Sequence, residues 1–465
     1  MTTSQTQLRD ADGSSAARIE SMPGPARAGE AGRPETPFLG FAPFLRMNLA
    51  GTDLLPIHRE MLARVERRPD DTNLWMNLAN VLLCLGERDL GLKIQAYALG
   101  RRRAYRLAAS RQPAKLRLLL LLTPGDLAAN TPLDCLLEAS DIDLLFYYVS
   151  PDAPLAAPVP EHDAVFVAIG ESEQTRALLA ALEQALAGWP RPVLNAPQRI
   201  PATGRARASA LLQHAPGLRM PPTLRASRRA LLTIAQSKAR LPAVFEGCDF
   251  PLILRPVGSH AGRSLEKIDR ADEIAGYLSR VDAAEFYLSL FIDYSGKDGL
   301  FRKYRIALVG GVAYACHMAV SSNWMVHYVN AGMYEDAHKR AEEADFMARF
   351  GDFADRHRSA LDAIYRRTML DYVCVDCAQT ADGELLVFEI DHAMVVHAMD
   401  PEHLFARKRQ ELQKVRSAFR ELLFASRARR TSDAAQPQPP QAGAAPSKFV
   451  SCAATRSMTC GQAPG

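Results

Sequence analysis

The sequence LDYVCVDCAQTADGELLVFEIDHAM, residues 370–394, contains two runs of strand-forming residues on either side of Asp382-Gly383. An Asp-Gly pair between two such runs is typical of a tight β-hairpin turn. Side chains alternate between the two faces of a strand, so Glu389 and Asp391 share one face of the second strand. Because both strands approach the same turn, Asp376 can lie on that face of the first strand. The sequence therefore predicts three carboxylates on one patch of a hairpin.

A divalent cation would explain why these carboxylates stand among apolar residues such as Val387 and Phe388. Buried together without partners they would repel one another, at a cost of several kcal/mol each. Mg²⁺ takes oxygen ligands and keeps water or substrate phosphates in its remaining positions. We therefore expect a metal site at Asp376, Glu389 and Asp391 that binds Mg²⁺, with Mn²⁺ as the alternative. The competing interpretation is an acidic edge on a solvent-facing strand.

A second candidate site lies upstream in FPLILRPVGSHAGRSLEKI, residues 250–268, where a strand ends in a basic residue and a proline. The glycines that follow allow backbone N–H groups to approach phosphate oxygens without a Cβ in the way. Glycines after a strand are also common in ordinary turns, which is the alternative. We expect a phosphate-binding loop formed by Arg255, Gly258, Ser259, His260 and Gly262.

In order and spacing, these segments resemble the ATP-grasp carboxylate–amine ligases, in particular the ATP-binding domain of the glutathione synthetase type. Metal ligands in that family are an aspartate and a Glu-x-Asn pair on adjacent strands. Here Asp391 replaces the asparagine, which adds a charge and keeps a ligand. Arg255 stands where the family usually has lysine, and its permanent charge and planar fork keep the phosphate contact. Arg255 is therefore a candidate catalytic residue as well. The resemblance runs from about Leu116 to Phe424.

The resemblance also implies how the chain would hold ATP. In the family, a short extended segment makes backbone hydrogen bonds to adenine, which needs one donor, one acceptor and flat apolar walls. The residues that match this adenine-binding segment are Leu288, Ser289, Leu290, Phe291 and Ile292.

Further candidate catalytic residues follow from the same resemblance. Arg305 matches the family arginine that is directed at the transferring phosphate and the acyl group, and Arg302 and Lys303 compete for this role. The next stretch, SSNWMVHYVNAGMY at residues 321–334, is expected to cover the nucleotide or read the acceptor substrate. Within it, His327 is the candidate base, and a structural histidine is the alternative.

Two further pairs of residues lie near the hairpin. His392 and His397 flank the metal strand without an assigned role, and as metal ligands they would suit zinc better than magnesium. Cys374 and Cys377 form a lone C-x-x-C within a strand, where they point to opposite faces. We therefore interpret them as buried thiols and not as a redox or zinc pair.

The whole chain is expected to fold as a multidomain protein of the α/β (α+β) class, because 465 residues exceed a single core. Residues 1–50 and 426–465 have the composition of disordered or linking segments. Residues 51–112 predict a helical hairpin that resembles a tetratricopeptide repeat (TPR), either as a simple cap or as a peptide-binding module. Residues 113–222 predict a small parallel α/β domain. Residues 223–425 would form the ATP-grasp domain.

Composition excludes several classes of partner. A net charge of +4 from 56 basic and 52 acidic residues gives no electrostatic case for nucleic acid or a membrane surface. The first residues lack the basic start and apolar core of a secretion signal, and the apolar run Leu116–Leu122 is too short to cross a bilayer. We therefore expect a soluble, cytoplasmic protein. Eight cysteines without regular spacing favour reduced thiols.

Together these features predict an ATP- and Mg²⁺-dependent ligase. A substrate carboxylate would attack the γ-phosphoryl group, and an amine would convert the acyl phosphate into an amide. The partners expected are a carboxylate and an amine, with a peptide recruited by the helical segment as one option and a homodimer as another. Two alternatives remain: an ATP-grasp phosphotransferase, and a nucleotide-binding TPR scaffold without ligase activity.

Overall fold

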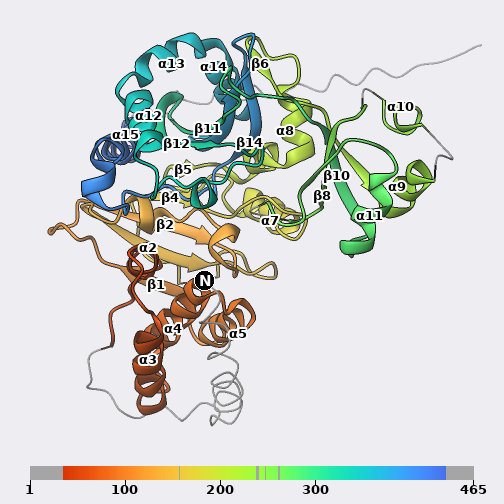
Figure 1. The fold of residues 1–465 in the computed structure, drawn as a ribbon. Helices are drawn as coiled ribbons and strands as arrows, with labels where there is room; N and C mark the ends of the chain where they lie inside the picture. Colours follow the sequence, from red (N-terminus) through yellow and green to blue (C-terminus); the bar gives the residue numbers. More distant parts are fainter. Residues whose placement is uncertain (1–34, 157, 237–239, 247, 260–261, 436–465) are drawn as a thin grey trace, which may run out of the picture.

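The computed structural model describes residues 35–156, 158–236, 240–246, 248–259 and 262–435. Within these residues the chain forms a mixed α/β structure with three sheets, which confirms the predicted class (Figure 1). The predicted disordered ends lie mostly outside the described residues. Where the two overlap, the structure differs from the prediction. Helix α2 (Ala42–Leu49) lies in the expected linker, and α15 (Glu402–Ala435) extends into the expected tail.

The helices that follow α2 are α3 (Leu55–Arg67), α4 (Thr72–Leu85) and α5 (Arg88–Leu99). Asp71 caps α4 by accepting a hydrogen bond from the backbone N–H of Leu74 at 3.3 Å. Gly86 ends α4 with a φ of 87°, a left-handed conformation that favours glycine. Helices α4 and α5 then pack against each other as the predicted hairpin.

Three asparagines on α4 hold residues 36–40 of the same chain. The buried Asn77 donates to one backbone carbonyl of this segment and accepts from one backbone N–H, both at 2.9 Å. Asn73 and Asn80 donate to two further carbonyls, at 2.7 and 2.9 Å. A side-chain amide suits an extended backbone because it both donates and accepts. This face of the helical hairpin is therefore filled by the chain itself.

The first sheet has the strand order β1-β3-β2-β4-β5. Strands β2 to β5 are parallel, as predicted, and β1 adds an antiparallel edge beside β3. Strand β3 is buried on both faces, which is typical of parallel strands between layers. The strands are β1 (Ala104–Leu107), β2 (Leu116–Leu122), β3 (Ile142–Tyr148), β4 (Ala164–Val167) and β5 (Val193–Leu194). The helices of this region are η1 (Leu127–Ala129), α6 (Leu133–Leu136), α7 (Arg176–Ala185), η2 (Pro197–Thr203) and α8 (Arg205–Leu212).

The second sheet is antiparallel, with the order β7-β10-β8-β9. It has a hydrophobic core of its own, in which Tyr277 packs against Phe286 with ring centroids 5.8 Å apart. The strands are β7 (Thr223–Ser227), β8 (Leu252–Pro256), β9 (Glu266–Ile268) and β10 (Glu285–Leu290). The helices are α9 (Arg228–Ala235), α10 (Leu241–Val244) and α11 (Glu273–Arg280).

The third sheet has the order β12-β11-β13-β14-β6 and contains the predicted hairpin. Gly383 turns the chain between the two hairpin strands with a φ of 86°. The strands are β6 (Leu218–Arg219), β11 (Phe301–Val309), β12 (Val312–Ser321), β13 (Tyr372–Gln379) and β14 (Leu385–Asp391). The helices are η3 (Tyr328–Asn330), α12 (Ala337–Ala348), α13 (Phe350–Arg356), α14 (Arg358–Thr368) and α15.

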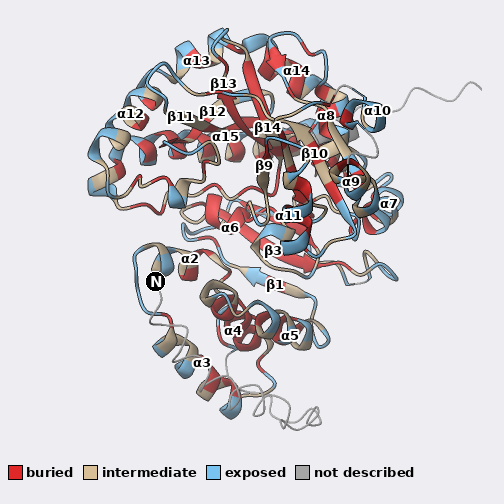
Figure 2. Cartoon of the chain, turned by 45° about the vertical axis from the view of Figure 1, so that its right-hand side comes forward, coloured by how far each residue is buried: buried red, intermediate tan, exposed pale blue. Residues whose placement is uncertain are grey.

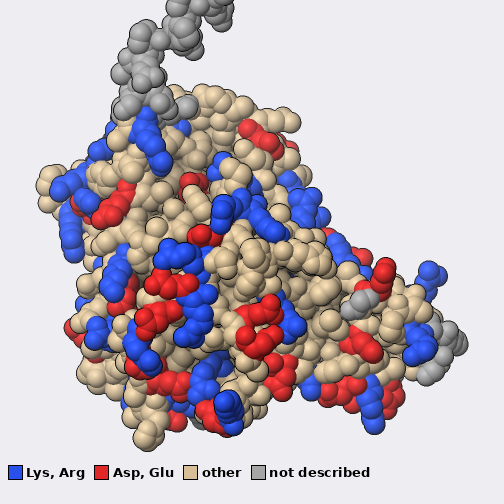
Figure 3. Space-filling model, turned by 90° about the horizontal axis from the view of Figure 1, so that it is seen from above, with Lys and Arg blue, Asp and Glu red and all other residues tan. Residues whose placement is uncertain are grey.

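The first and third sheets share their cores, so that together they form one body on which the second sheet is set (Figure 2). Phe166 on β4, Tyr372 on β13 and Phe419 on α15 meet with ring centroids 5.3 to 6.5 Å apart. Within the described residues, no helix combines the length and apolar character needed to span a bilayer. On the face drawn in Figure 3, basic and acidic side chains are interspersed, in keeping with the nearly balanced charge.

Candidate active site

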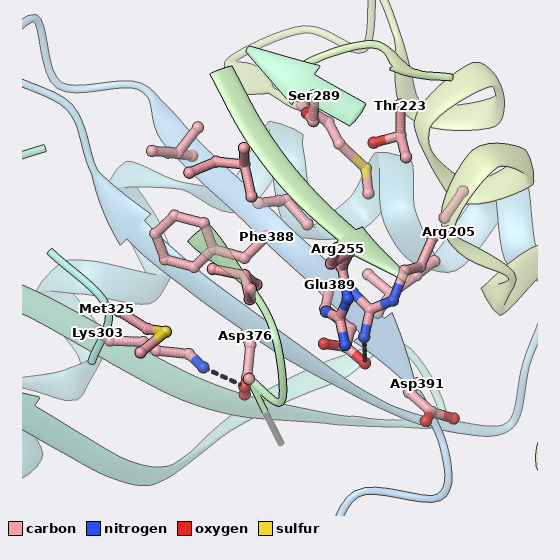
Figure 4. Close-up of a pocket in the computed structure, with 18 of the residues that line it drawn as sticks. Arg205, Thr223, Arg255, Ser289, Lys303, Met325, Asp376, Phe388, Glu389 and Asp391 are labelled. Atoms are coloured by element: carbon pink, nitrogen blue, oxygen red, sulfur yellow. Dashed lines mark hydrogen bonds and ion pairs between the residues drawn. The ribbon is translucent and has the colours of Figure 1, made fainter. Parts of the chain in front are cut away.

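A cavity of about 480 Å³ lies between the second and third sheets (Figure 4). Residues from β8 and β10 form one wall, and residues from β11, β13 and β14 form the other. Further lining residues come from the start of α8, from the loop before α12, from the segment after β14 and from the short helix η1, which packs beside the first sheet. Segments from or beside each of the three sheets therefore contribute side chains to one cavity.

The three predicted carboxylates line this cavity together. Asp376 on β13 pairs directly with Glu389 on β14, and Asp391 follows two residues later. Residues that pair directly across two strands project to the same face. The register set at the turn would pair Asp376 with Phe388, and an irregularity next to Asp376 shifts its partner to Glu389. The predicted common face therefore depends on this shift as well as on side-chain alternation.

Asp376 is neutralised by two cations from β11. Its carboxylate accepts hydrogen bonds from Arg305 at 2.7 and 3.0 Å and forms an ion pair with Lys303 at 2.8 Å. Burial alone would raise the pKa of Asp376, but these two positive charges outweigh it and hold the pKa well below its usual range. The sequence presented Lys303 and Arg305 as competitors, whereas both contact the same carboxylate.

Glu389 and Asp391 differ in their surroundings. Arg205 on α8 donates to Glu389 at 2.9 Å, and its charge outweighs the effect of burial, so that the pKa of Glu389 is lowered. Asp391 accepts a hydrogen bond from the N–H of Ala393 at 2.9 Å, but no lysine or arginine among the described residues forms an ion pair with it. Burial, and next the charge of Glu389, raise the pKa of Asp391 to about 7.

These ion pairs determine which of the three carboxylates are available to a metal ion. In the described part of the chain, no three His, Cys, Asp or Glu side chains are grouped closely enough to hold a metal ion. Asp376 is already paired with Lys303 and Arg305. Glu389 and Asp391 remain, and one or two carboxylates completed by phosphate oxygens and water are a common donor set for Mg²⁺. A divalent cation beside Asp391 would also supply the positive charge that this carboxylate lacks.

Arg255 ends β8 at the cavity wall and organises the loop that follows. Its guanidinium donates to the hydroxyl of Ser259 at 3.1 Å and to the carbonyl of the same residue. Burial, and next the nearby charge of Arg205, lower the pKa of Arg255 to about 10, so the side chain remains charged at neutral pH. Among the described residues it has no carboxylate ion-pair partner, unlike Arg205 and Arg305.

The predicted phosphate-binding loop reaches the cavity only in part. Gly262 lines it with a φ of 69°, and a Cβ at this position would collide with the imidazole of His327. Gly258 also has a positive φ, of 77°, but neither it nor Ser259 is part of the lining. His260 lies outside the described residues.

The predicted adenine-binding segment needs a correction. Strand β10 is an interior strand, so the backbone of Leu288 and Ser289 already pairs with both β7 and β8. The side chain of Leu288 is buried in the core of the second sheet, away from the cavity. Ser289, Leu290, Phe291 and Ile292 do line the cavity, and among the described residues Ile292 has no backbone hydrogen-bond partner. The backbone groups that are free to bind the base of a nucleotide therefore begin at the end of β10.

The loop between β12 and α12, which we call the covering loop, lines one side of the cavity. Trp324 and His327 line it together with the two residues between them. The ring of Trp324 meets that of Phe291 edge-on at 5.6 Å, and its carbonyl accepts a hydrogen bond from the hydroxyl of Tyr294. Burial, and next the charge of Lys303, lower the pKa of His327, so its imidazole is neutral at pH 7.

The remaining histidines and cysteines near the hairpin have structural positions. His392 is fully buried and forms a 3.0 Å hydrogen bond with the carbonyl of Ile169, just after β4, and burial lowers its pKa to about 4. Burial likewise lowers the pKa of His397 to about 4. Cys374 and Cys377 are both buried and belong to different hydrophobic clusters, which confirms the interpretation as thiols on opposite faces.

Several lining residues were not among those predicted from the sequence. Arg205 comes from a helix 184 residues before Glu389, and no motif around it marks the contact. Leu127 and Ala128 enter from η1, a short turn with no signal in its composition. Tyr287 enters from the same strand as Ser289, where strand alternation could have placed it, and Thr223 enters through the pairing of β7 with β10, which the sequence does not show.

No protein-family model matches this chain, and no curated protein matches its sequence. Among solved structures, the chain is similar to a D-alanine–D-alanine ligase from Bacillus anthracis complexed with ATP, at 11% identity over 68% of this chain and 99% of that one, with a TM-score of 0.40. An ATP-grasp RimK domain protein from Sphaerobacter thermophilus has 15% identity over 66% and 99%, with a TM-score of 0.39. The ATP-grasp ligase PsnB, complexed with a minimal precursor, Mg and ADP, has 14% identity over 67% and 98%, with a TM-score of 0.38. Similarity at this level assigns neither a reaction nor a substrate to this chain.

The buried pairing of Asp376 gives a stability prediction. Asp376→Asn leaves Arg305 and Lys303 without their counter-charge, and we expect the free energy of unfolding to fall by about 3–5 kcal/mol. The matched control is Asp345→Asn, which breaks an exposed pair with Arg349 and should cost about 0–1 kcal/mol. Thermal and urea unfolding measure both. Equal losses in the two variants would show that the Asp376 pairing does not hold the sheet.

Proposed function

We propose that this chain is an ATP-dependent carboxylate–amine ligase of the ATP-grasp type. The observation that carries the proposal is the order of side chains along the single strand β14. Apolar residues at its start, carboxylates at its end and apolar residues just beyond it all line one cavity. A nucleoside triphosphate has a matching order, with a flat apolar base at one end and charged phosphates at the other.

The apolar end supports a base-binding site. Leu386 and Phe388 on β14 pack with Ile292 and Tyr294, and the rings of Phe388 and Tyr294 lie 5.0 Å apart. From Leu386 to Asp391 the strand rises by roughly 16 Å, at about 3.3 Å per residue, which is the scale of an extended nucleoside triphosphate. The base would therefore lie at the end of β10, and the phosphates would reach the carboxylates.

The middle of the cavity supports phosphate binding. Four basic residues face it, namely Arg205, Arg255, Lys303 and Arg305, against three carboxylates. Arg255 is the one whose guanidinium has no carboxylate partner among the described residues, so its charge is the most available to a phosphate. Preorganised positive charge of this kind stabilises the charge that develops on a transferring phosphoryl group.

Glu389 and Asp391 are the residues that would hold Mg²⁺. When bound, the ion would supply positive charge to the phosphate oxygens and orient them. The chain's own contribution is to present both carboxylates on one face of β14, with Arg205 holding Glu389 in place.

The far end of the cavity supports an acid-binding site. Ala393, Met394 and Val395 follow the carboxylates, and Leu127 and Ala128 face the same cavity from the first sheet. Arg305 donates to the carbonyl of Val395 at 3.1 Å, which fixes this segment beside the ion pair of Arg305 with Asp376. A substrate carboxylate held here would attack the γ-phosphorus, and the bond from that phosphorus to ADP would break.

The second step transfers the acyl group to an amine. The amine attacks the carbonyl carbon of the acyl phosphate, inorganic phosphate leaves, and a proton is released. His327 lines the cavity as a neutral imidazole, so it is able to accept that proton. The two substrates besides ATP would therefore be a carboxylic acid and an amine.

An assay of ADP formation tests the reaction. Purified protein is incubated with ATP, Mg²⁺ and panels of carboxylic acids, with hydroxylamine as the accepting amine. We expect acid-dependent release of ADP together with a hydroxamate product, because hydroxylamine traps an acyl phosphate. A stable phosphorylated product without a hydroxamate would identify a phosphotransferase instead. ATP binding without ADP release for any acid would favour the nucleotide-binding scaffold.

The proposed phosphate contact predicts a defect in nucleotide binding. Arg255→Ala removes charged hydrogen bonds worth about 1.5–3 kcal/mol, so the affinity for ATP should fall by roughly 10- to 100-fold. The affinity for adenosine should be unchanged, because it has no phosphates. Calorimetry measures both ligands, and Arg229→Ala on the exposed face of α9 is the control. Equal losses for ATP and adenosine would contradict the assignment.

The proposed metal ligands predict a loss of Mg²⁺ dependence. In the unchanged protein, Mg²⁺ should strengthen the binding of ADP. In the double variant Glu389→Gln with Asp391→Asn, this strengthening should disappear, because neutral amides are poorer ligands for a hard cation. The control is Asp345→Asn with Asp362→Asn, which changes two exposed carboxylates. If Mg²⁺ strengthens ADP binding equally in both double variants, the metal lies elsewhere.

A further inference from the structure

A buried polar cluster lies behind the covering loop of the cavity. Lys408 on α15 is only 5% exposed, and its ammonium group is 2.7 Å from a carboxylate oxygen of Asp400. The same ammonium group lies 3.7 Å from the centre of the Tyr328 ring. Glu343 on α12, which is 2% exposed, completes the cluster. Burying charged groups is costly, and an apolar residue of similar size often serves stability equally well.

Tyr328 connects this cluster to the covering loop. It directly follows His327, the last of the loop residues that line the cavity. Its hydroxyl donates to Glu343 at 2.9 Å, and the other oxygen of Glu343 accepts the backbone N–H of Met318 on β12 at 3.1 Å. The ring is therefore held from two sides, by a carboxylate at the hydroxyl and by the lysine over its face.

Asp400 connects the cluster to the segment beyond β14. It follows Val395, whose carbonyl accepts a hydrogen bond from Arg305. The other carboxylate oxygen of Asp400 accepts a hydrogen bond from the hydroxyl of Tyr334, at the far end of the covering loop. Asp400 thus contacts the covering loop and Lys408 at once.

The covering loop and the segment after β14 are therefore both connected to one side chain, Lys408. The covering loop reaches Lys408 through Tyr328 and through Tyr334 with Asp400, and the segment after β14 reaches it through Asp400. Phe405 on α15 packs against Tyr334 with ring centroids 5.2 Å apart and closes the cluster on the apolar side. A buried ion pair of this kind is best suited to fixing the register of the parts that it joins.

We infer that Lys408 is a positioning residue. It holds the covering loop and the segment after β14 in the relative position that nucleotide binding requires. It acts through Tyr328 and Asp400 and does not line the cavity itself. The inference rests on the proposed function, because the cavity that these segments enclose is the proposed ATP site. It predicts that removing the charge of Lys408 loosens the loop around Trp324 and His327.

Three variants test this inference. Lys408→Met removes the charge and keeps most of the volume, Lys408→Arg restores the charge, and Lys414→Met on the exposed side of α15 is the control. We expect Lys408→Met to weaken ATP binding at least fivefold, and Lys408→Arg to bind within about twofold of the unchanged protein. Acrylamide should quench the fluorescence of Trp324 more strongly in Lys408→Met, with a Trp324→Phe version of each protein providing the background.

The outcomes separate the inference from the proposed function. If the unchanged protein binds no ATP, the proposed function fails, and the accessibility of Trp324 still decides whether Lys408 positions the loop. Unchanged ATP affinity together with unchanged quenching in Lys408→Met would overturn the inference. If that variant does not fold, Tyr328→Phe replaces it, because it removes only the hydrogen bond to Glu343 and keeps the ring under Lys408. Tyr328→Phe should also weaken ATP binding and expose Trp324, and no change in either would equally overturn the inference.

Discussion

The buried ion cluster of Asp376 with Arg305 and Lys303 is the constraint around which the third sheet and its cavity are arranged. Strand β11 carries both cations on one face, and β13 places the carboxylate beside them. Charges at the centre of a sheet persist only when they are paired, because each would otherwise lose its hydration without compensation. The pairing therefore fixes two cations at the wall of a cavity, where a phosphate chain can meet them.

The other walls complete that environment with groups of different chemistry. The second sheet brings Arg255, which has no carboxylate partner among the described residues, and the free edge at the end of β10. Strand β14 brings a pair of carboxylates, one of which lacks a cation among those residues. Behind the covering loop, Lys408 on α15 contacts both Tyr328 of that loop and Asp400 of the segment after β14. The charged side chains, the apolar surface and the free backbone groups of the cavity thus come from separate elements.

Features with a short sequence period could be predicted, and features that depend on distant pairing could not. The common face of Glu389 and Asp391 follows from the two-residue repeat of a strand, and the Asp-Gly turn predicted the hairpin. The pairing of Asp376 with Glu389 also needs a register shift next to Asp376, which the sequence does not mark. By contrast, nothing in a single sequence shows that β10 is an interior strand, which moves the free edge beyond Leu288 and Ser289. Arg205 was missed because only the folded chain brings it to Glu389.

We propose that the cavity between the second and third sheets holds a nucleoside triphosphate with its phosphates at β14. The most direct measurement is a crystal structure of the full chain with a non-hydrolysable ATP analogue and Mg²⁺. We predict density for the base beside Phe388 and Ile292, and for an ion between the phosphates and the carboxylates of Glu389 and Asp391. A nucleotide bound outside this cavity, or one bound with its phosphates directed away from β14, would show that the cavity is not a nucleotide site of this kind.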